Sequence, residues 1–204
     1  MGKLRLIKIE DFELGFARLK EAKLELAGGE DLYEYKKAEF EIKNFDQAEV
    51  FPSSFYALKS RMEFLKLYKA RLWSDLKIDL FHLPGILYLR DGDKIFGLVP
   101  PIVEIYPEED GVITAVLQDG IHRILLAKEM SEELDCLRII NKKADLNYLP
   151  YAYPNSWEAV NLVDKVPEIK KKYRRILHYS FMRPLSSIFD QKIVSHWADY
   201  GRKR

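Results

Sequence analysis

A continuous apolar run that ends in a glycine turn constrains this fold more than any other feature of the sequence. The run spans Val112 to Leu117 and contains no charged residue. Strands of this kind lie in the centre of a sheet, because a strand with one solvated face alternates apolar and polar residues. After Asp119-Gly120, residues 124–130 show no two-residue alternation and predict a helix. A buried strand that leads directly into a helix favours an α+β architecture.

Turn residues divide the neighbouring sequence into further short elements. Asp91-Gly92 predicts a hairpin, and Pro100-Pro101 interrupts the chain before another strand. The predicted strands are 37–43, 86–89, 95–98, 102–106, 112–117 and 134–140. The predicted helices are 12–26, which would end at Gly28-Gly29, a longer helix from Ser53 or Ser54 to Leu76, and later helices that begin near Trp157, Pro167 and Pro184.

These elements predict one compact unit with three parts. Residues 1–80 read as an α-rich N-terminal extension, residues 81–155 as a core with a small mixed sheet, and residues 156–204 as C-terminal helices packed on that core. The predicted fold class is therefore α+β, with helices on both sides of the sheet.

Charge is balanced over the whole chain but not along it. The net charge is +1, whereas residues 165–204 carry an excess of about eight positive charges. Within that section, Lys170 to Arg175 is a basic run with one aromatic residue, Tyr173, inside it. This pattern is typical of contact with a phosphate backbone and equally of a solvated helix face. The single cysteine, Cys136, excludes a disulfide framework, and the scattered histidines predict no metal site. No apolar run is long enough to span a membrane, so a cytoplasmic protein is expected.

The sequence Asp119-Gly120-Ile121-His122-Arg123 has the properties of an anion site. A strand that ends in a glycine turn and opens a helix gathers unpaired N–H groups at the positive end of the helix dipole. Gly120 lacks a Cβ and allows close approach, while His122 and Arg123 can donate to phosphate oxygens. Asp119 fits an N-cap, a carboxylate near Mg²⁺, or a base for a hydroxyl group. The alternative is that Asp119 only caps the helix and that His122 and Arg123 face solvent.

This element resembles the D-G-x-H-R motif of the ParB/sulfiredoxin superfamily. Pro101-Ile102-Val103 is similar to the proline-led strand that precedes the motif in these proteins, and the similarity covers residues 81–155. The resemblance implies a small mixed sheet of the ParB/sulfiredoxin type. It also implies that the motif binds the phosphate of a nucleotide or of a nucleic acid.

The branches of that superfamily differ in residues that can be read here. Sulfiredoxins have a cysteine immediately before the histidine, where this chain has Ile121, so that activity is not expected. Free serine kinases carry D-G-H-H-R and a downstream aromatic-proline element, which Tyr151-Ala152-Tyr153-Pro154 resembles. ParB-type partition proteins add a helix-turn-helix segment that is not evident in this sequence.

The resemblance therefore implies a nucleotide-binding phosphotransferase of the serine-kinase-like branch. ATP or ADP with Mg²⁺ would be bound, and a small hydroxyl compound would be the second substrate. Gly120, Ile121, His122 and Arg123 would hold the phosphates, and Asp119 or His122 would assist proton removal.

Three residues are candidates for the substrate side of the site. Glu104 projects from a neighbouring strand, and Tyr153 and Trp157 belong to an aromatic cluster in a loop. A solvated strand face for Glu104 and simple loop packing for Tyr153 and Trp157 are the alternatives. Two other functions stay open: a nucleic-acid-binding module without catalysis, and a partner protein whose phosphate site is idle.

Overall fold

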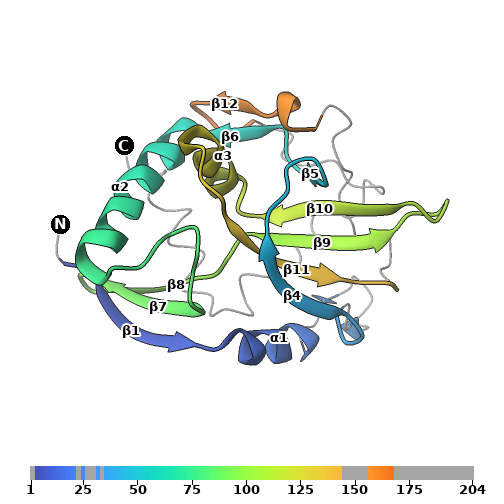
Figure 1. Ribbon diagram of the computed structural model, residues 1–204, viewed down its shortest axis with the longest axis horizontal. Helices are drawn as coiled ribbons and strands as arrows, with labels where there is room; N and C mark the ends of the chain where they lie inside the picture. Colours follow the sequence, from blue (N-terminus) through green and yellow to red (C-terminus); the bar gives the residue numbers. More distant parts are fainter. Residues whose placement is uncertain (1–2, 22–23, 26–30, 33–34, 144–155, 168–204) are drawn as a thin grey trace.

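The computed structural model describes residues 3–21, 24–25, 31–32, 35–143 and 156–167. Its centre is a five-stranded mixed sheet in the order β4-β11-β9-β10-β5 (Figure 1). The strands are β4 (Glu39–Asn44), β11 (Asp135–Ile140), β9 (Ile102–Pro107), β10 (Ile113–Asp119) and β5 (Val50–Pro52). The β9–β10 and β11–β4 pairs are antiparallel, whereas the β11–β9 and β10–β5 pairs are parallel. The α+β class is confirmed.

Both edges of this sheet come from the first fifty-odd residues. Among the described residues, β4 pairs only with β11 and β5 pairs only with β10, so the strands of the predicted core lie between them. The segment before residue 80 was predicted to be α-rich, but it supplies these two edge strands as well as helices. Its strands are short, which is why the helical periodicity dominates that part of the sequence.

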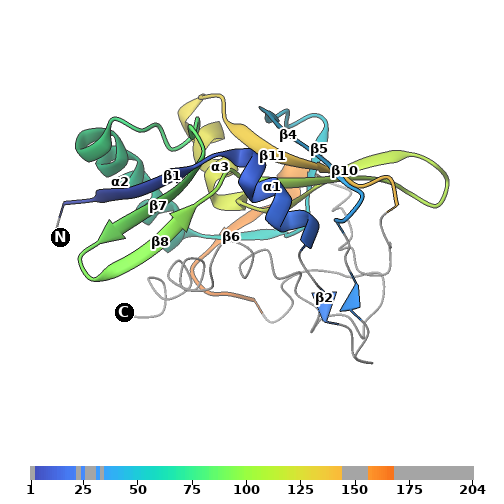
Figure 2. The ribbon, with the colours of Figure 1, turned by 90° about the horizontal axis from the view of Figure 1, so that it is seen from below.

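Helices cover the two faces of the sheet separately. Helix α3 (Ile121–Met130) packs on one face, and helix α2 (Lys59–Leu76) packs against α3. Val103 and Ile105 of β9 belong to one hydrophobic cluster with residues of both helices. Helix α1 (Phe12–Glu21) lies on the other face (Figure 2), and its Phe16 and Leu19 belong to one hydrophobic cluster with Ile102 of β9. Because side chains alternate along a strand, β9 is buried on both faces, as its burial pattern shows.

Smaller sheets complete the structure. Strand β1 (Arg5–Glu10) pairs with β7 (Ile86–Asp91), which forms the hairpin predicted at Asp91-Gly92 with β8 (Lys94–Leu98). Strand β6 (Tyr56–Leu58) pairs in parallel with β12 (Asn161–Val163), next to a 3-10 helix (Ser156–Ala159). Two short strands, β2 (Leu24–Glu25) and β3 (Asp31–Leu32), pair with each other.

Two predicted helices begin or end at other residues. The helix expected from Ser53 or Ser54 begins at Lys59, because Tyr56 to Leu58 form β6, and it has no side-chain cap. The helix expected over residues 12–26 ends at Glu21. The helices expected from Pro167 and Pro184 lie outside the described residues.

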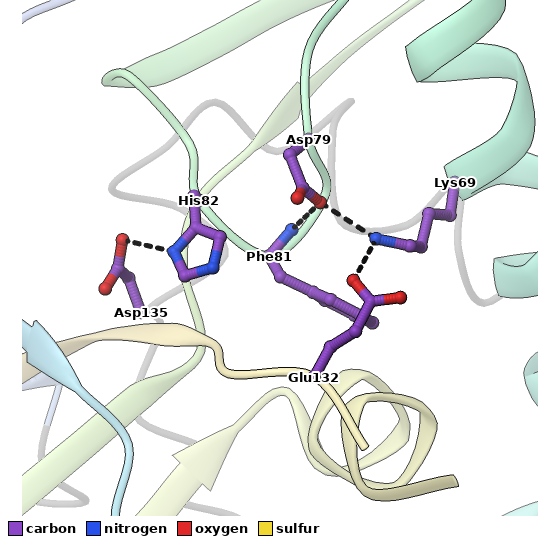
Figure 3. Close-up of polar contacts among 6 residues, drawn as sticks. All are labelled: Lys69, Asp79, Phe81, His82, Glu132 and Asp135. Atoms are coloured by element: carbon purple, nitrogen blue, oxygen red, sulfur yellow. Dashed lines mark hydrogen bonds and ion pairs between the residues drawn. The ribbon is translucent and has the colours of Figure 1, made fainter. Parts of the chain in front are cut away.

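Ion pairs hold α2 against the segments at the C-terminal end of α3 (Figure 3). Lys69 of α2 contacts Asp79 at 3.0 Å and Glu132, just after α3, at 2.8 Å. Nearby, His82 Nδ1 lies 3.0 Å from a carboxylate oxygen of Asp135 at the start of β11. These contacts fix the end of α3 that lies away from the Asp119-Gly120 turn.

Candidate phosphate-binding site

The turn between β10 and α3 depends on a glycine at position 120. Gly120 adopts φ +100° and is the N-cap residue of α3. A Cβ placed on Gly120 would lie 2.6 Å from Cβ of Pro101 and 2.8 Å from its Cα. The predicted strand–turn–helix is confirmed, but the space left by the missing Cβ is filled by Pro101. Gly120 is therefore required for the turn and for close packing against the proline that leads β9.

The N-terminus of α3 is not capped by a side chain. Asp119 was one candidate for that cap, but the N-cap is Gly120 and makes no side-chain hydrogen bond. The carbonyl of Gly120 accepts from the N–H groups of Arg123 and Ile124. The N–H groups of Ile121 and His122 lie too early in the helix to reach a carbonyl one turn before them. Asp119 is exposed at the end of β10, so an exposed carboxylate lies beside these first N–H groups of α3.

His122 is held as a neutral ring. Its Nε2 accepts a hydrogen bond of 2.9 Å from the backbone N–H of Leu58, so this nitrogen carries no proton. Burial, and then the positive charge of Arg61, lower the pKa of His122 to about 4. Near neutral pH the proton of the ring therefore lies on Nδ1, which is left as a hydrogen-bond donor.

Arg123 is buried rather than exposed to solvent. Its side chain is 7% exposed, and its NH1 donates to the backbone carbonyl of Val99. Burial lowers the pKa of Arg123 to about 10, while the charge of Asp119 acts in the opposite direction. The guanidinium remains charged at neutral pH, and no carboxylate forms an ion pair with it in the described part of the chain.

A second arginine lies close to this turn, and no sequence motif points to it. Arg61 is in the first turn of α2, and its charge acts on the pKa of both His122 and Tyr56. Its Nε is buried and has no hydrogen-bond partner in the residues that the structure describes. Helical periodicity predicts Met62 and Leu65 in the core, and both are buried, but periodicity carries no signal for a role of the neighbouring Arg61.

Glu104 is in the interior, on the face of the sheet that α1 covers. The side chain is fully buried, and its carboxylate accepts hydrogen bonds from the hydroxyl of Tyr35 at 3.2 Å and from the amide of Asn141 at 3.5 Å. The solvated strand face considered for this residue is therefore wrong. Helix α3 packs on the opposite face of the sheet, so the structure does not bring Glu104 together with His122.

The remaining predicted residues lie apart from the turn or outside the described residues. Trp157 is 5% exposed, donates from Nε1 to the carbonyl of Val50 at 2.8 Å, and packs edge-on against Phe45. These contacts are those of a packing residue. Tyr153 and the basic segment Lys170 to Arg175 lie outside the described residues, so their expected roles stay predictions.

A comparison with protein families decides the relationship. The model of the ParB CE domain matches residues 16–161, which is more than half of the chain. The chain belongs to the ParB CE domain family. The match begins at residue 16, well before residue 81, so it covers the second part of α1, all of α2 and the edge strands of the sheet. No curated protein and no solved structure matches the chain significantly.

Two further findings concern only the described residues of this ParB CE domain. No group of three or more His, Cys, Asp or Glu side chains lies in a position to hold a metal ion. No described helix is long and apolar enough to cross a membrane.

Proposed function

We propose that this ParB CE domain binds the phosphates of a nucleotide at the N-terminus of α3 and transfers a phosphoryl group to a small hydroxyl compound. The observation that carries the proposal is the state of Arg123. Its guanidinium is 7% exposed, and its described partner is the uncharged carbonyl of Val99. Burial of a guanidinium that forms no ion pair among the described residues is costly, and the nearby charge of Asp119 offsets this cost only in part. A bound phosphate would offset more of it.

The donors around Arg123 suit phosphate oxygens. The N–H groups of Ile121 and His122 open α3, where the helix dipole adds positive charge. The Nδ1–H of His122 is a further donor, because Nε2 is occupied by Leu58. The residues present therefore fit a nucleotide phosphate, with the guanidinium of Arg123 as the charged partner. ATP or ADP would bring Mg²⁺, which proteins commonly hold through phosphates and one or two carboxylates.

In the transfer step, Asp119 rather than His122 acts as the general base. Asp119 is exposed beside the turn, where its carboxylate can accept the proton of an attacking hydroxyl. As the new oxygen–phosphorus bond forms, the bond to the leaving nucleotide oxygen breaks, and Arg123 balances the charge that develops. His122 is a poor base at neutral pH, because its pKa is lowered to about 4 and its Nε2 is engaged. It serves to hold and orient the phosphate.

Calorimetric titration of ATP and ADP with Mg²⁺ tests the binding step. Arg123→Gln removes the charge, and it should weaken binding about 10- to 100-fold, the value of one charge-assisted hydrogen bond. Lys128→Gln, at an exposed position later in α3, is the matched control and should bind as the wild type does. Unchanged affinity in Arg123→Gln would contradict the proposal.

The chemical step is tested with Asp119→Asn. This variant should keep nucleotide affinity and lose nucleotide-dependent phosphorylation of free serine, the acceptor in the branch that the motif resembles. If Asp119→Asn still transfers the phosphoryl group at the wild-type rate, Asp119 is not the base. Binding of nucleic acid through Lys170 to Arg175 stays a prediction, and it differs from nucleotide binding by a steep dependence on salt.

A further inference from the structure

The N-termini of α2 and α3 lie together in this fold. Helix α2 begins at Lys59, directly after β6, and α3 begins at Ile121. The backbone N–H of Leu58, at the N-cap of α2, donates to His122 in the first turn of α3 over 2.9 Å. Figure 1 shows β6, the start of α2 and α3 side by side above the end of β10. The positive ends of two helix dipoles therefore meet near the candidate phosphate.

Arg61 brings a second side-chain charge to this junction. Lys59, the other basic residue in the first turn of α2, pairs with Asp164 at 3.2 Å. Arg61 has no such pair in the described part of the chain, and its buried Nε has no hydrogen-bond partner there. A buried N–H donor without a partner destabilises the fold, so native proteins rarely keep one without a reason. A bound acceptor would remove that cost.

The junction holds two guanidinium groups and one exposed carboxylate. Arg61 and Arg123 contribute two positive charges, His122 is neutral, and Asp119 is exposed at the edge. Tyr56, next to Arg61, is also neutral, because burial raises the pKa of its hydroxyl. A phosphate in the backbone of a nucleic acid carries one negative charge. Two linked phosphoryl groups carry more negative charge and offer one phosphoryl group to each guanidinium.

We propose that Arg61 and the first turn of α2 form a second phosphate subsite beside the one at α3. The ligand class is then a compound with two adjacent phosphoryl groups, namely a nucleoside diphosphate, a nucleoside triphosphate or pyrophosphate. Arg123 and α3 hold one phosphoryl group, and Arg61 holds the other. This inference rests on the proposed phosphate binding at α3. Arg61 then determines the preference for a ligand with two phosphoryl groups over a ligand with one.

Pyrophosphate and inorganic phosphate are the probes for this subsite. Calorimetric titration of the full chain without metal should show pyrophosphate binding at least about 10-fold more tightly than phosphate, because an additional charge-assisted contact forms. Arg61→Gln should bring the two affinities within about 2-fold of each other while leaving the affinity for phosphate unchanged. Lys128→Gln serves again as the exposed control and should preserve the wild-type ratio.

The melting temperature without ligand separates a binding role from a structural one. Because Arg61 leaves a buried donor unpaired, Arg61→Gln should melt at the wild-type temperature or above it. A wild type that binds both probes equally overturns the second subsite and leaves phosphate binding at α3 intact. An Arg61→Gln variant that weakens both probes alike, or that melts lower and retains the ratio, also overturns it. Failure of both probes to bind the wild type overturns the subsite and the proposed function together.

Discussion

His122→Gln is expected to remove a pH-dependent loss of stability from the protein. Glutamine can accept the N–H of Leu58 through its side-chain oxygen, so the contact between the starts of α2 and α3 is kept. Glutamine does not titrate, whereas the pKa of His122 in the fold is lowered to about 4 by burial and by Arg61. A comparison of the two proteins over pH therefore isolates the proton equilibrium of one ring.

The sign and size of the effect follow from linkage. The pKa of His122 lies near 6.5 in the unfolded chain and near 4 in the fold, so the unfolded state binds the proton more tightly. The stability that depends on the neutral ring is complete above about pH 6.5 and is lost as the pH falls toward 4. The full difference is about 3 kcal/mol, and about 2 kcal/mol of it should be lost at pH 5. Protonation of Nε2 would also break the hydrogen bond from Leu58, because two N–H donors would then point at each other.

Urea denaturation at half-unit steps between pH 7.5 and pH 4.5 measures this loss. The wild type should lose about 2 kcal/mol more than His122→Gln by pH 5, because all other titrating groups are shared. The ring resonances of His122 should show no protonation above about pH 5 in the folded protein. Parallel pH profiles for the two proteins, or a measured pKa near 6.5, would refute the reasoning.

Two further substitutions test packing at the site and next to the sheet. Gly120→Ala should destabilise the protein by at least about 1–3 kcal/mol in urea denaturation, because φ is +100° and Pro101 fills the space of the new Cβ. Gly92→Ala is the control, since φ is +61° but nothing lies within 4 Å of its Cβ, and it should cost less; equal losses would contradict the contact with Pro101. Trp157→Phe removes the hydrogen bond to Val50 and should lower the free energy of unfolding by about 1–3 kcal/mol with no change in nucleotide affinity. If Trp157→Phe instead lowers the affinity for nucleotide and leaves the free energy of unfolding unchanged, Trp157 contributes to ligand binding rather than to packing.

Local patterns in the sequence predicted local elements well. The Asp91-Gly92 hairpin forms between β7 and β8, and the glycine at position 120 connects β10 to α3 as expected. Both depend on a few adjacent residues, because glycine tolerates positive φ and a change of hydrophobic period marks the end of a strand. The moderately alternating segment near residue 40 was also predicted as a strand, and it is β4.

Elements that depend on distant partners were not predictable in the same way. Tyr56 to Leu58 form a strand because β12, about one hundred residues later, pairs with them, and this pairing moves the start of α2 to Lys59. The same shift brings Arg61 to the start of the helix, beside His122. The sequence offered no means of joining residue 61 to residue 122, so the motif predicted one arginine at the junction and the fold supplies two.

The order of strands in the sheet has a consequence for synthesis of the chain. Strand β4 is complete at Asn44, but its partner β11 begins at Asp135, and β5 likewise waits for β10. At about 5–20 residues per second, β4 leaves the ribosome roughly 5–20 s before it can pair. Its charged outer positions, Glu39 and Lys43, are of the kind that discourages pairing with another chain in that interval. The two edge strands are thus the first strands of this sheet to be synthesised, and they cannot pair until the central strands have been made.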